Sequence, residues 1–185
     1  MNQKIIAPYT QAKFKPFGKW DEAVQKMGRL NPEIKDAALS AQKALCGDIL
    51  NAVKWHIIKQ DLPWKKLSSK YRAKKLKYGR DRRKLISHGL MYENITMWKR
   101  ANGWQYFVGI PRGIYGLTVS GKTNKRDLAT VAISNEFGRH RRPLWGPTIQ
   151  EFGGAKGIKV TYIDLFEKRL RRRGLGKYVK RLKVI

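Results

Sequence analysis

The feature that most constrains this chain is a helical pattern of small apolar residues that begins at Asn31 and ends near Gln60. Successive apolar positions are separated by four, three, four, four, three and four residues, which places them on one face of an α-helix. These positions are Ile34, Ala38, Ala41, Leu45, Ile49, Ala52 and His56. Asn31 is a favoured N-cap, and Pro32 suits the first helical position. Because many of the apolar residues are alanines, we predict a long helix that lies close to its packing partner, with His56 as a packed histidine.

Two runs rich in aromatic and β-branched residues predict a β-hairpin further along the chain. They span residues 94–100 and 104–110, and the sequence Ala-Asn-Gly between them is a turn signal. Residues 116–120, "GLTVS", are expected to continue the same sheet. Residues 121–127, "GKTNKRD", are expected to form a polar loop.

Helical spacing returns at residues 126–137 and stops at Gly138. We expect Phe137 to lie in the core and Gly138 to end the helix in a left-handed conformation, which glycine adopts without steric cost. Residues 158–162 predict a strand, and residues 163–170 predict a helix after it.

The length of 185 residues fits one domain of ordinary size with terminal extensions. Residues 1–20 contain prolines and aromatic residues and predict an extended N-terminal arm, before a short helix at 21–30. Residues 21–157 are predicted to form the main domain. Residues 158–185 are predicted to form a basic C-terminal extension with a strand, a helix and a tail.

The formal net charge of +28 indicates a polyanionic or acidic partner, or a place in an assembly whose other members compensate the charge. The charge is uneven, because residues 1–61 carry a net charge of +4 and residues 62–185 carry +24. The single cysteine, Cys46, excludes an intramolecular disulfide. No apolar run long enough for a membrane span or a signal peptide is found, so we expect synthesis in a cytoplasm and no membrane partner.

The segment at residues 64–84 is the most basic part of the chain, with eleven basic residues and one acidic residue. Ser68 or Ser69 can cap a helix here, and Gly79 can end it. Leu67, Tyr71 and the alkyl stem of Lys74 are expected to share one face of that helix. The segment is either a solvated basic helix or a surface that faces phosphate groups or an acidic partner.

The candidate residues for this DNA-facing or partner-binding surface come from the basic segment and from a second cluster after Gly138. They are Lys65, Lys66, Lys70, Arg72, Lys74, Lys75, Arg80, Arg82, Arg83, Arg139, Arg141 and Arg142.

Catalytic and metal-binding patterns are not found in the sequence. His56, His88 and His140 are far apart, without cysteines or carboxylates at metal-ligand spacing. No glycine-rich phosphate loop follows a strand, and no nucleophile elbow occurs. We therefore expect no enzyme, no cofactor and no metal. A nuclease that uses scattered carboxylates, Glu136 among them, is a minor alternative.

The segment at residues 134–148, "SNEFGRHRRPLWGPT", combines an acidic residue, two glycines, basic residues and two prolines. Arg142 precedes Pro143, which disfavours helical backbone and predicts an extended connection. Glu136 is expected to act as a clamp, either on this loop or on an adjacent subunit. The segment is therefore predicted to fix geometry rather than to perform chemistry.

Four motifs in a fixed order suggest a family. They are "LPWKKLSSKYRAKK" at 62–75, "KLISHGLMYENI" at 84–95, "ATVAISNEFG" at 129–138 and "RRPLWGPT" at 141–148. Over about residues 30–155, the chain resembles the virion-morphogenesis, or tail-completion and neck, proteins of tailed bacteriophages. The matching positions that we assign to the structural motif are Trp64, Gly89, Glu136, Phe137, Gly138 and Pro143.

The resemblance implies an α+β fold in which the long N-terminal helix packs on a small, mostly antiparallel sheet, with further helices, an arm and a basic tail. It implies a structural protein of the virion, without a catalytic site, that forms a ring of six or twelve copies at the head–tail junction. The expected partners are neighbouring neck or connector proteins, tail-terminator or tail-tube proteins, and packaged DNA held by nonspecific electrostatics. A sequence-nonspecific nucleic-acid-binding protein is the alternative that the charge alone suggests.

Overall fold

The computed structural model describes residues 32–81, 83, 85, 89–100, 105–138 and 141–176. The described chain belongs to two compact units that alternate along the sequence. The first unit includes Ala52–Thr96 and Gly109–Pro147, and the second includes 32–51, Met97–Val108 and 148–176. The predicted arm at 1–20, the short helix at 21–30 and the end of the tail lie outside the described residues.

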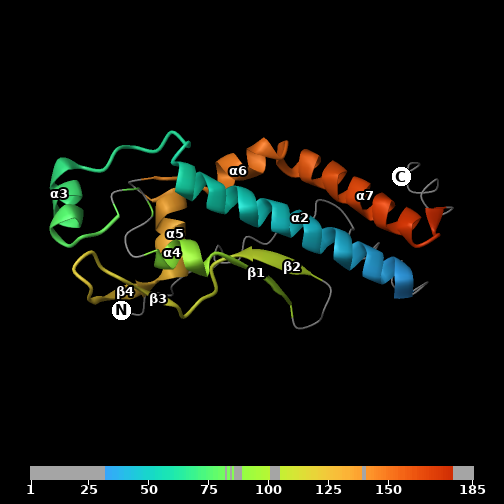
Figure 1. Ribbon diagram of the computed structural model, residues 1–185, viewed down its shortest axis with the longest axis horizontal. Coiled ribbons are helices and arrows are strands. Elements are labelled where there is room, and N and C mark those ends of the chain that lie inside the picture. The colour runs from blue at the N-terminus through green and yellow to red at the C-terminus, as the bar shows by residue number, and fades with distance from the viewer. Residues whose placement is uncertain are drawn as a thin grey trace, which may run out of the picture. The chain divides into compact units, whose positions relative to one another are not determined.

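The long helix is confirmed as α2, Pro32–Lys59, with Glu33 in its first turn. In the second unit its alanines face α7, Gly154–Arg172, and the two helices lie side by side in Figure 1. The buried residues of this contact are Ile34, Ala37, Ala38, Ala41, Phe166 and Leu170. Beyond the core, Arg173 forms an ion pair with Asp36.

The predicted strand at 158–162 is wrong, because these residues lie inside α7. The side chains of Tyr162, Phe166 and Leu170 follow one another at intervals of four residues and meet α2. Burial on this helical face outweighs the preference of the β-branched residues nearby for extended backbone.

The predicted hairpin is confirmed as strands β1, Thr96–Lys99, and β2, Tyr106–Gly109. The rings of Trp98 and Phe107 stack across the two strands with centroids 5.9 Å apart. The backbone N–H of Tyr106 donates to Oε1 of Gln42 at 3.1 Å. This bond joins the sheet to α2, so the long helix packs on strands as the resemblance implied.

A second two-stranded sheet corrects two predictions. Residues 123–127, expected to be a loop, form strand β4, Thr123–Asp127, which pairs antiparallel with β3, Tyr115–Leu117. Strand β3 therefore does not continue the first hairpin. Gly116 lies so close to Leu128 that a Cβ would collide with that side chain. Strand β4 was assigned to a loop because its residues are polar. Such residues are tolerated in an antiparallel strand when only one face of the sheet is covered.

The remaining helices are short and have local signals. Helix α3, Ser69–Lys77, begins after Ser68, whose Oγ accepts from the N–H of Tyr71, as predicted. Helix α5, Leu128–Phe137, confirms the helix expected at 126–137. The others are α4, Leu90–Asn94, and α6, Trp145–Glu151.

The α+β fold class is confirmed by these helices and the two small sheets. Leu67 precedes α3 and is not part of the helix face on which it was expected. His56 is buried on α2, as predicted, and its Nδ1 lies 2.8 Å from Oδ1 of Asp61. No helix within the described residues is long and apolar enough to cross a membrane.

The contact between α2 and α7 predicts a large cost for truncation of its aromatic residue. Phe166→Ala should lower the free energy of unfolding by about 3–5 kcal/mol, because it leaves a cavity against the alanines of α2. The exposed Lys168→Ala on the same helix should change it by less than about 0.5 kcal/mol. Chemical denaturation measures both values. Equal losses in the two variants would contradict this core.

Asp127 predicts a pH-dependent contribution to stability. Its Oδ1 accepts from the N–H of Thr130 at 2.7 Å and caps α5, and this bond is the main reason that its pKa is lowered. A lowered pKa in the folded state gives stability that is present above the ordinary pKa and is lost as the pH falls through the folded value. Asp127→Ala should cost about 1 kcal/mol at pH 7 and less at pH 2.

Asp127→Asn is the matched control, because asparagine also caps helices but does not titrate. It should retain most of the stability at pH 7. A cost of Asp127→Ala that stays the same at both pH values, measured by urea denaturation, would rule out the carboxylate as its source.

Candidate functional site

Three residues of the predicted structural motif meet in the first unit. The carboxylate of Glu136 accepts hydrogen bonds from three consecutive backbone N–H groups, those of Leu144 at 2.7 Å, Trp145 at 3.2 Å and Gly146 at 2.9 Å. These groups lie at the start of α6, where backbone donors have no partner within the helix. We call this arrangement, together with the Trp64–Pro143 contact, the Glu136 junction.

Trp64 holds the same segment from the other side. Its indole Nε1 donates to the carbonyl oxygen of Pro143 at 2.6 Å, although 79 residues separate the two in sequence. Trp64 and Leu144 are both buried. Arg142 contributes a further bond through its backbone N–H, which donates to the Asn135 carbonyl at 2.6 Å. Residues 142–146 are therefore held by hydrogen bonds to α5 and to Trp64.

Glu136 was expected to hold either its own loop or an adjacent subunit. The structure shows that it holds its own loop. Among the described residues, its hydrogen-bond partners are the backbone N–H groups of residues 144–146 in the same chain. Gly146 fits this arrangement, since a Cβ there would lie 3.2 Å from Oε1 of Glu136.

Two other motif residues differ from their predictions. Phe137 is 66% exposed and does not lie in the core. Gly138 has φ −77° and ψ 177°, so its backbone is extended and not left-handed. Its N–H donates to the Ser134 carbonyl at 2.9 Å, and a Cβ would collide with that oxygen. Glycine is thus needed here for close approach, whereas Gly89 has φ 81° before α4.

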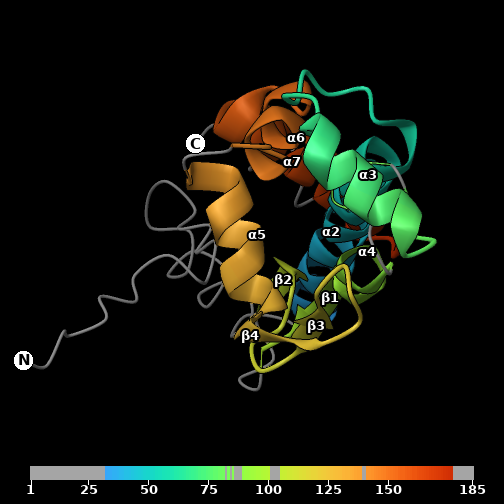
Figure 2. The same cartoon turned by 90° about the vertical axis from the view of Figure 1, so that its left-hand side faces the viewer.

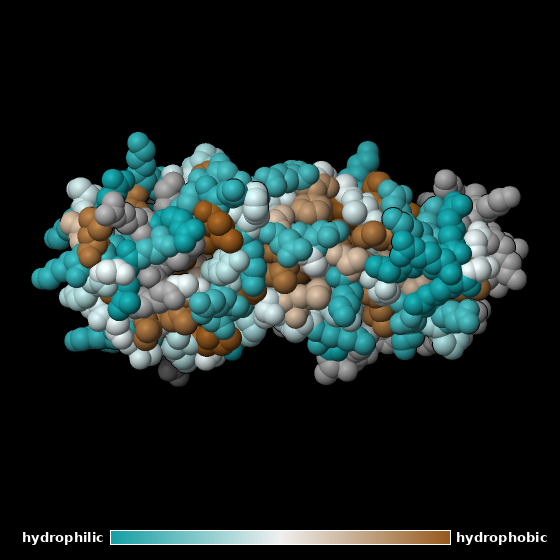
Figure 3. All heavy atoms as spheres, in the orientation of Figure 1, coloured by the Kyte–Doolittle hydropathy of each residue, from teal (hydrophilic) through white to brown (hydrophobic). Residues whose placement is uncertain are grey.

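Residues 65–77, which include the basic helix α3, expose five of the twelve predicted cations. Within the described residues, the exposed cations of residues 65–77 form no ion pair with a carboxylate. They are Lys65, Lys66, Lys70, Arg72 and Lys74, with Lys77 in addition. Figure 3 shows hydrophilic side chains projecting from the surface around α3.

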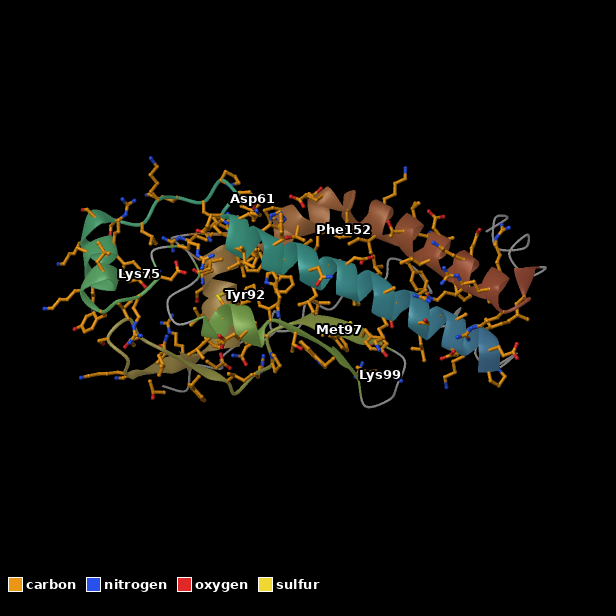
Figure 4. All side chains as sticks on the ribbon, viewed as in Figure 1. Asp61, Lys75, Tyr92, Met97, Lys99 and Phe152 are labelled. Atoms are coloured by element: carbon orange, nitrogen blue, oxygen red, sulfur yellow. The ribbon has the colours of Figure 1, made fainter. Side chains whose placement is uncertain are left out.

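Lys75 is an exception to the predicted surface, because it is only 2% exposed. Its side chain points from α3 to the following loop, where Nζ donates to the Arg83 carbonyl at 2.7 Å (Figure 4). Burial lowers the pKa of this lysine; the charge of Arg142 lowers it further, and Asp81 opposes both. Lys75 therefore orders the loop and does not offer its charge to a partner. The alkyl stem of Lys74 was expected on the packed face of α3, but Lys75 is the buried lysine and Lys74 is exposed.

The loop after α3 contains an internal ion pair. Arg83 donates to both oxygens of Asp81, with Nη2 2.6 Å from Oδ2. This contact is the main cause of the lowered pKa of Asp81. Arg80 is half-buried and its Nε donates to the Val119 carbonyl at 3.3 Å.

The second basic cluster is only partly described. Arg141 is exposed, and Arg142 is half-buried with an Nε that has no hydrogen-bond partner among the described residues. Arg82, Arg139, His88 and His140 lie outside the described residues. The structure therefore does not bring the whole predicted set of cations into one described cluster.

Sequence reasoning missed the cations of the second sheet. Lys122, Lys125 and Arg126 are exposed at the β3–β4 hairpin. Their charge was visible in the sequence, but the residues were assigned to a loop. The hairpin could have been recognised from Gly121, which lies in the turn between the two strands and has φ 87°.

The described residues contain no group of three or more His, Cys, Asp or Glu side chains arranged as metal ligands. Comparisons of the chain with protein-family models, characterised proteins and solved structures found no match.

The Glu136 junction predicts a graded loss of stability. Glu136→Ala should lower the free energy of unfolding by about 2–3 kcal/mol, because it leaves partly buried N–H groups without their charged acceptor. Glu136→Gln keeps one oxygen acceptor and should cost about half as much. The exposed Asp48→Ala serves as control and should be nearly neutral. A loss for Glu136→Ala no larger than that of the control, by chemical denaturation, would contradict this role.

Proposed function

We propose that this protein is a structural component of a tailed-phage virion, located at the head–tail junction, where copies form a ring through which DNA passes. The observation that carries the proposal is the Glu136 junction. Three of the six residues assigned to the motif of tail-completion and neck proteins, Trp64, Glu136 and Pro143, meet there through hydrogen bonds. These hydrogen bonds fix the path of the chain, as expected for a protein with a structural function.

The chemistry of Glu136 supports a structural role over a nuclease. Both carboxylate oxygens already accept backbone N–H groups. A metal-dependent nuclease needs carboxylate oxygens that are available to the metal. The proposed role therefore includes no catalysis and no cofactor.

The charge of the chain supports an assembly that contains DNA. A monomer with a net charge of +28 experiences strong self-repulsion, which a polyanion or acidic neighbouring proteins would relieve. In the proposed ring, exposed cations of α3 reduce the cost of holding DNA in a channel without reading its sequence. The proposed partners are further copies of the chain, neck or connector proteins, and tail-terminator or tail-tube proteins. Assembly takes place in the cytoplasm of the host.

A second candidate is a sequence-nonspecific nucleic-acid-binding protein that acts outside a particle. The exposed cations of α3, which form no ion pairs with described residues, favour it. The two functions differ in whether the protein belongs to a symmetric assembly.

Electron microscopy of the purified protein and of purified particles tests the proposal. We expect rings with six-fold or twelve-fold symmetry, and density for this chain between head and tail. A protein that is strictly monomeric and absent from particles, but binds DNA, would favour the second candidate. The Glu136→Ala variant should form fewer rings than the Asp48→Ala control, because the junction fixes the chain path.

A further inference from the structure

The first unit contains two separate basic segments that meet at Arg80. One is the exposed side of α3, and the other is the β3–β4 hairpin. Figure 2 shows both elements on the same face of this unit. The Arg80 Nε donates to the Val119 carbonyl, and its Nη2 lies 3.7 Å from the position that a Cβ would occupy at Gly121, next to Lys122. Arg80 therefore joins the end of α3 to the turn of the hairpin.

The acidic residues in these two segments are used internally. Asp81 accepts the bonds from Arg83, and Asp127 caps α5 and also accepts from the N–H of Gly113 at 3.3 Å. In contrast, the exposed cations Lys70, Lys74 and Lys125 form no ion pair with a described residue. The folded unit thus neutralises its carboxylates in structural contacts and leaves its cations exposed to a partner.

The dimensions of the two segments fit an extended polyanion. From Lys70 to Lys77 the helix rises about 10 Å, and from Thr123 to Arg126 the strand extends by about 10 Å. Duplex DNA carries one negative charge per about 1.7 Å of its axis, so each segment spans several phosphates. A single carboxylate or a free phosphate ion would engage only a small part of either row.

From these contacts we propose that α3 and the β3–β4 hairpin form one binding surface for the phosphate backbone of duplex DNA, held in register by Arg80. The α3 contribution is made by Lys70, Lys74 and Lys77, which recur at intervals of four and three residues on one face of the helix, and the hairpin contribution by Lys122, Lys125 and Arg126. Lys75 is a positioning residue, because its ammonium group is buried and binds the loop. This inference rests on the DNA contact in the function proposed above and specifies the surface that makes it.

Matched triple variants of the full-length chain test this surface. The α3 variant carries Lys70→Gln, Lys74→Gln and Lys77→Gln, and the hairpin variant carries Lys122→Gln, Lys125→Gln and Arg126→Gln. The control carries Lys156→Gln, Lys168→Gln and Arg172→Gln on the exposed side of α7. All three variants lose the same charge. Circular dichroism checks that each is folded.

Fluorescence anisotropy with a labelled 20-base-pair duplex at several salt concentrations gives the affinity and its salt dependence. Each lost phosphate contact lowers the slope of log affinity against log salt by about 0.9. We expect the α3 and hairpin variants each to lower this slope by about 2 and to weaken binding at least tenfold at 100 mM salt. The control should change the slope by less than about 1.

Arg80 has its own matched pair. Arg80→Gln and Lys77→Gln each remove one charge, but only Arg80 donates to the hairpin. We expect Arg80→Gln to weaken duplex binding at least threefold more than Lys77→Gln. Equal effects of the two substitutions would overturn the role of Arg80 in register.

Three results would overturn the surface itself. In the first result, the control variant weakens duplex binding as much as the other two variants, which would indicate generic attraction to a basic protein. In the second result, the hairpin variant binds the duplex with the same affinity as the wild type. In the third result, neither triple variant changes the affinity for the duplex. An acidic protein would then be the partner of these cations. Rings seen by electron microscopy alongside any of these results would leave the proposed virion role standing, whereas altered slopes without rings would leave only the DNA surface.

Discussion

The first unit depends on the contact between the Glu136 carboxylate and the start of α6. Three backbone N–H groups that a helix leaves without partners are satisfied by one side chain from the end of α5. Trp64 holds the preceding carbonyl through its indole nitrogen. Because residues 142–146 are bound both to α5 and to Trp64, their backbone path follows from these bonds.

The second physical constraint is the balance of charge. The carboxylates form bonds within the fold, whereas most of the cations stay exposed. Glu136, Asp127 and Asp81 all accept bonds that order the backbone or pair with a neighbouring arginine. Most lysines of α3 remain exposed, and only Lys75 is buried to hold a loop. The fold thus concentrates positive charge on its surface. The proposed functions, a virion ring around DNA and a duplex-binding face, both relieve the repulsion that results.

The sequence predicted correctly the elements that depend on interactions between residues close together in the chain. The spacing of alanines predicted α2, aromatic runs predicted β1 and β2, and Ser68 predicted the start of α3. The α+β class, which the resemblance implied, agrees with these elements. At the candidate site, the sequence identified Trp64, Glu136 and Pro143 as structural residues and most of the exposed cations of α3. The roles of these cations stay predictions.

The sequence by itself determined helix periodicity, helix caps and the uneven charge, because these depend on residues close together in the chain. Tertiary structure decided that Lys75 is buried while Lys74 is exposed, that residues 158–162 are helical against α2, and that Gly138 is extended. It also exposed Phe137 and paired β4 with β3. Each of these outcomes depends on contacts between distant segments, whose gain in burial and hydrogen bonding exceeds the local preference.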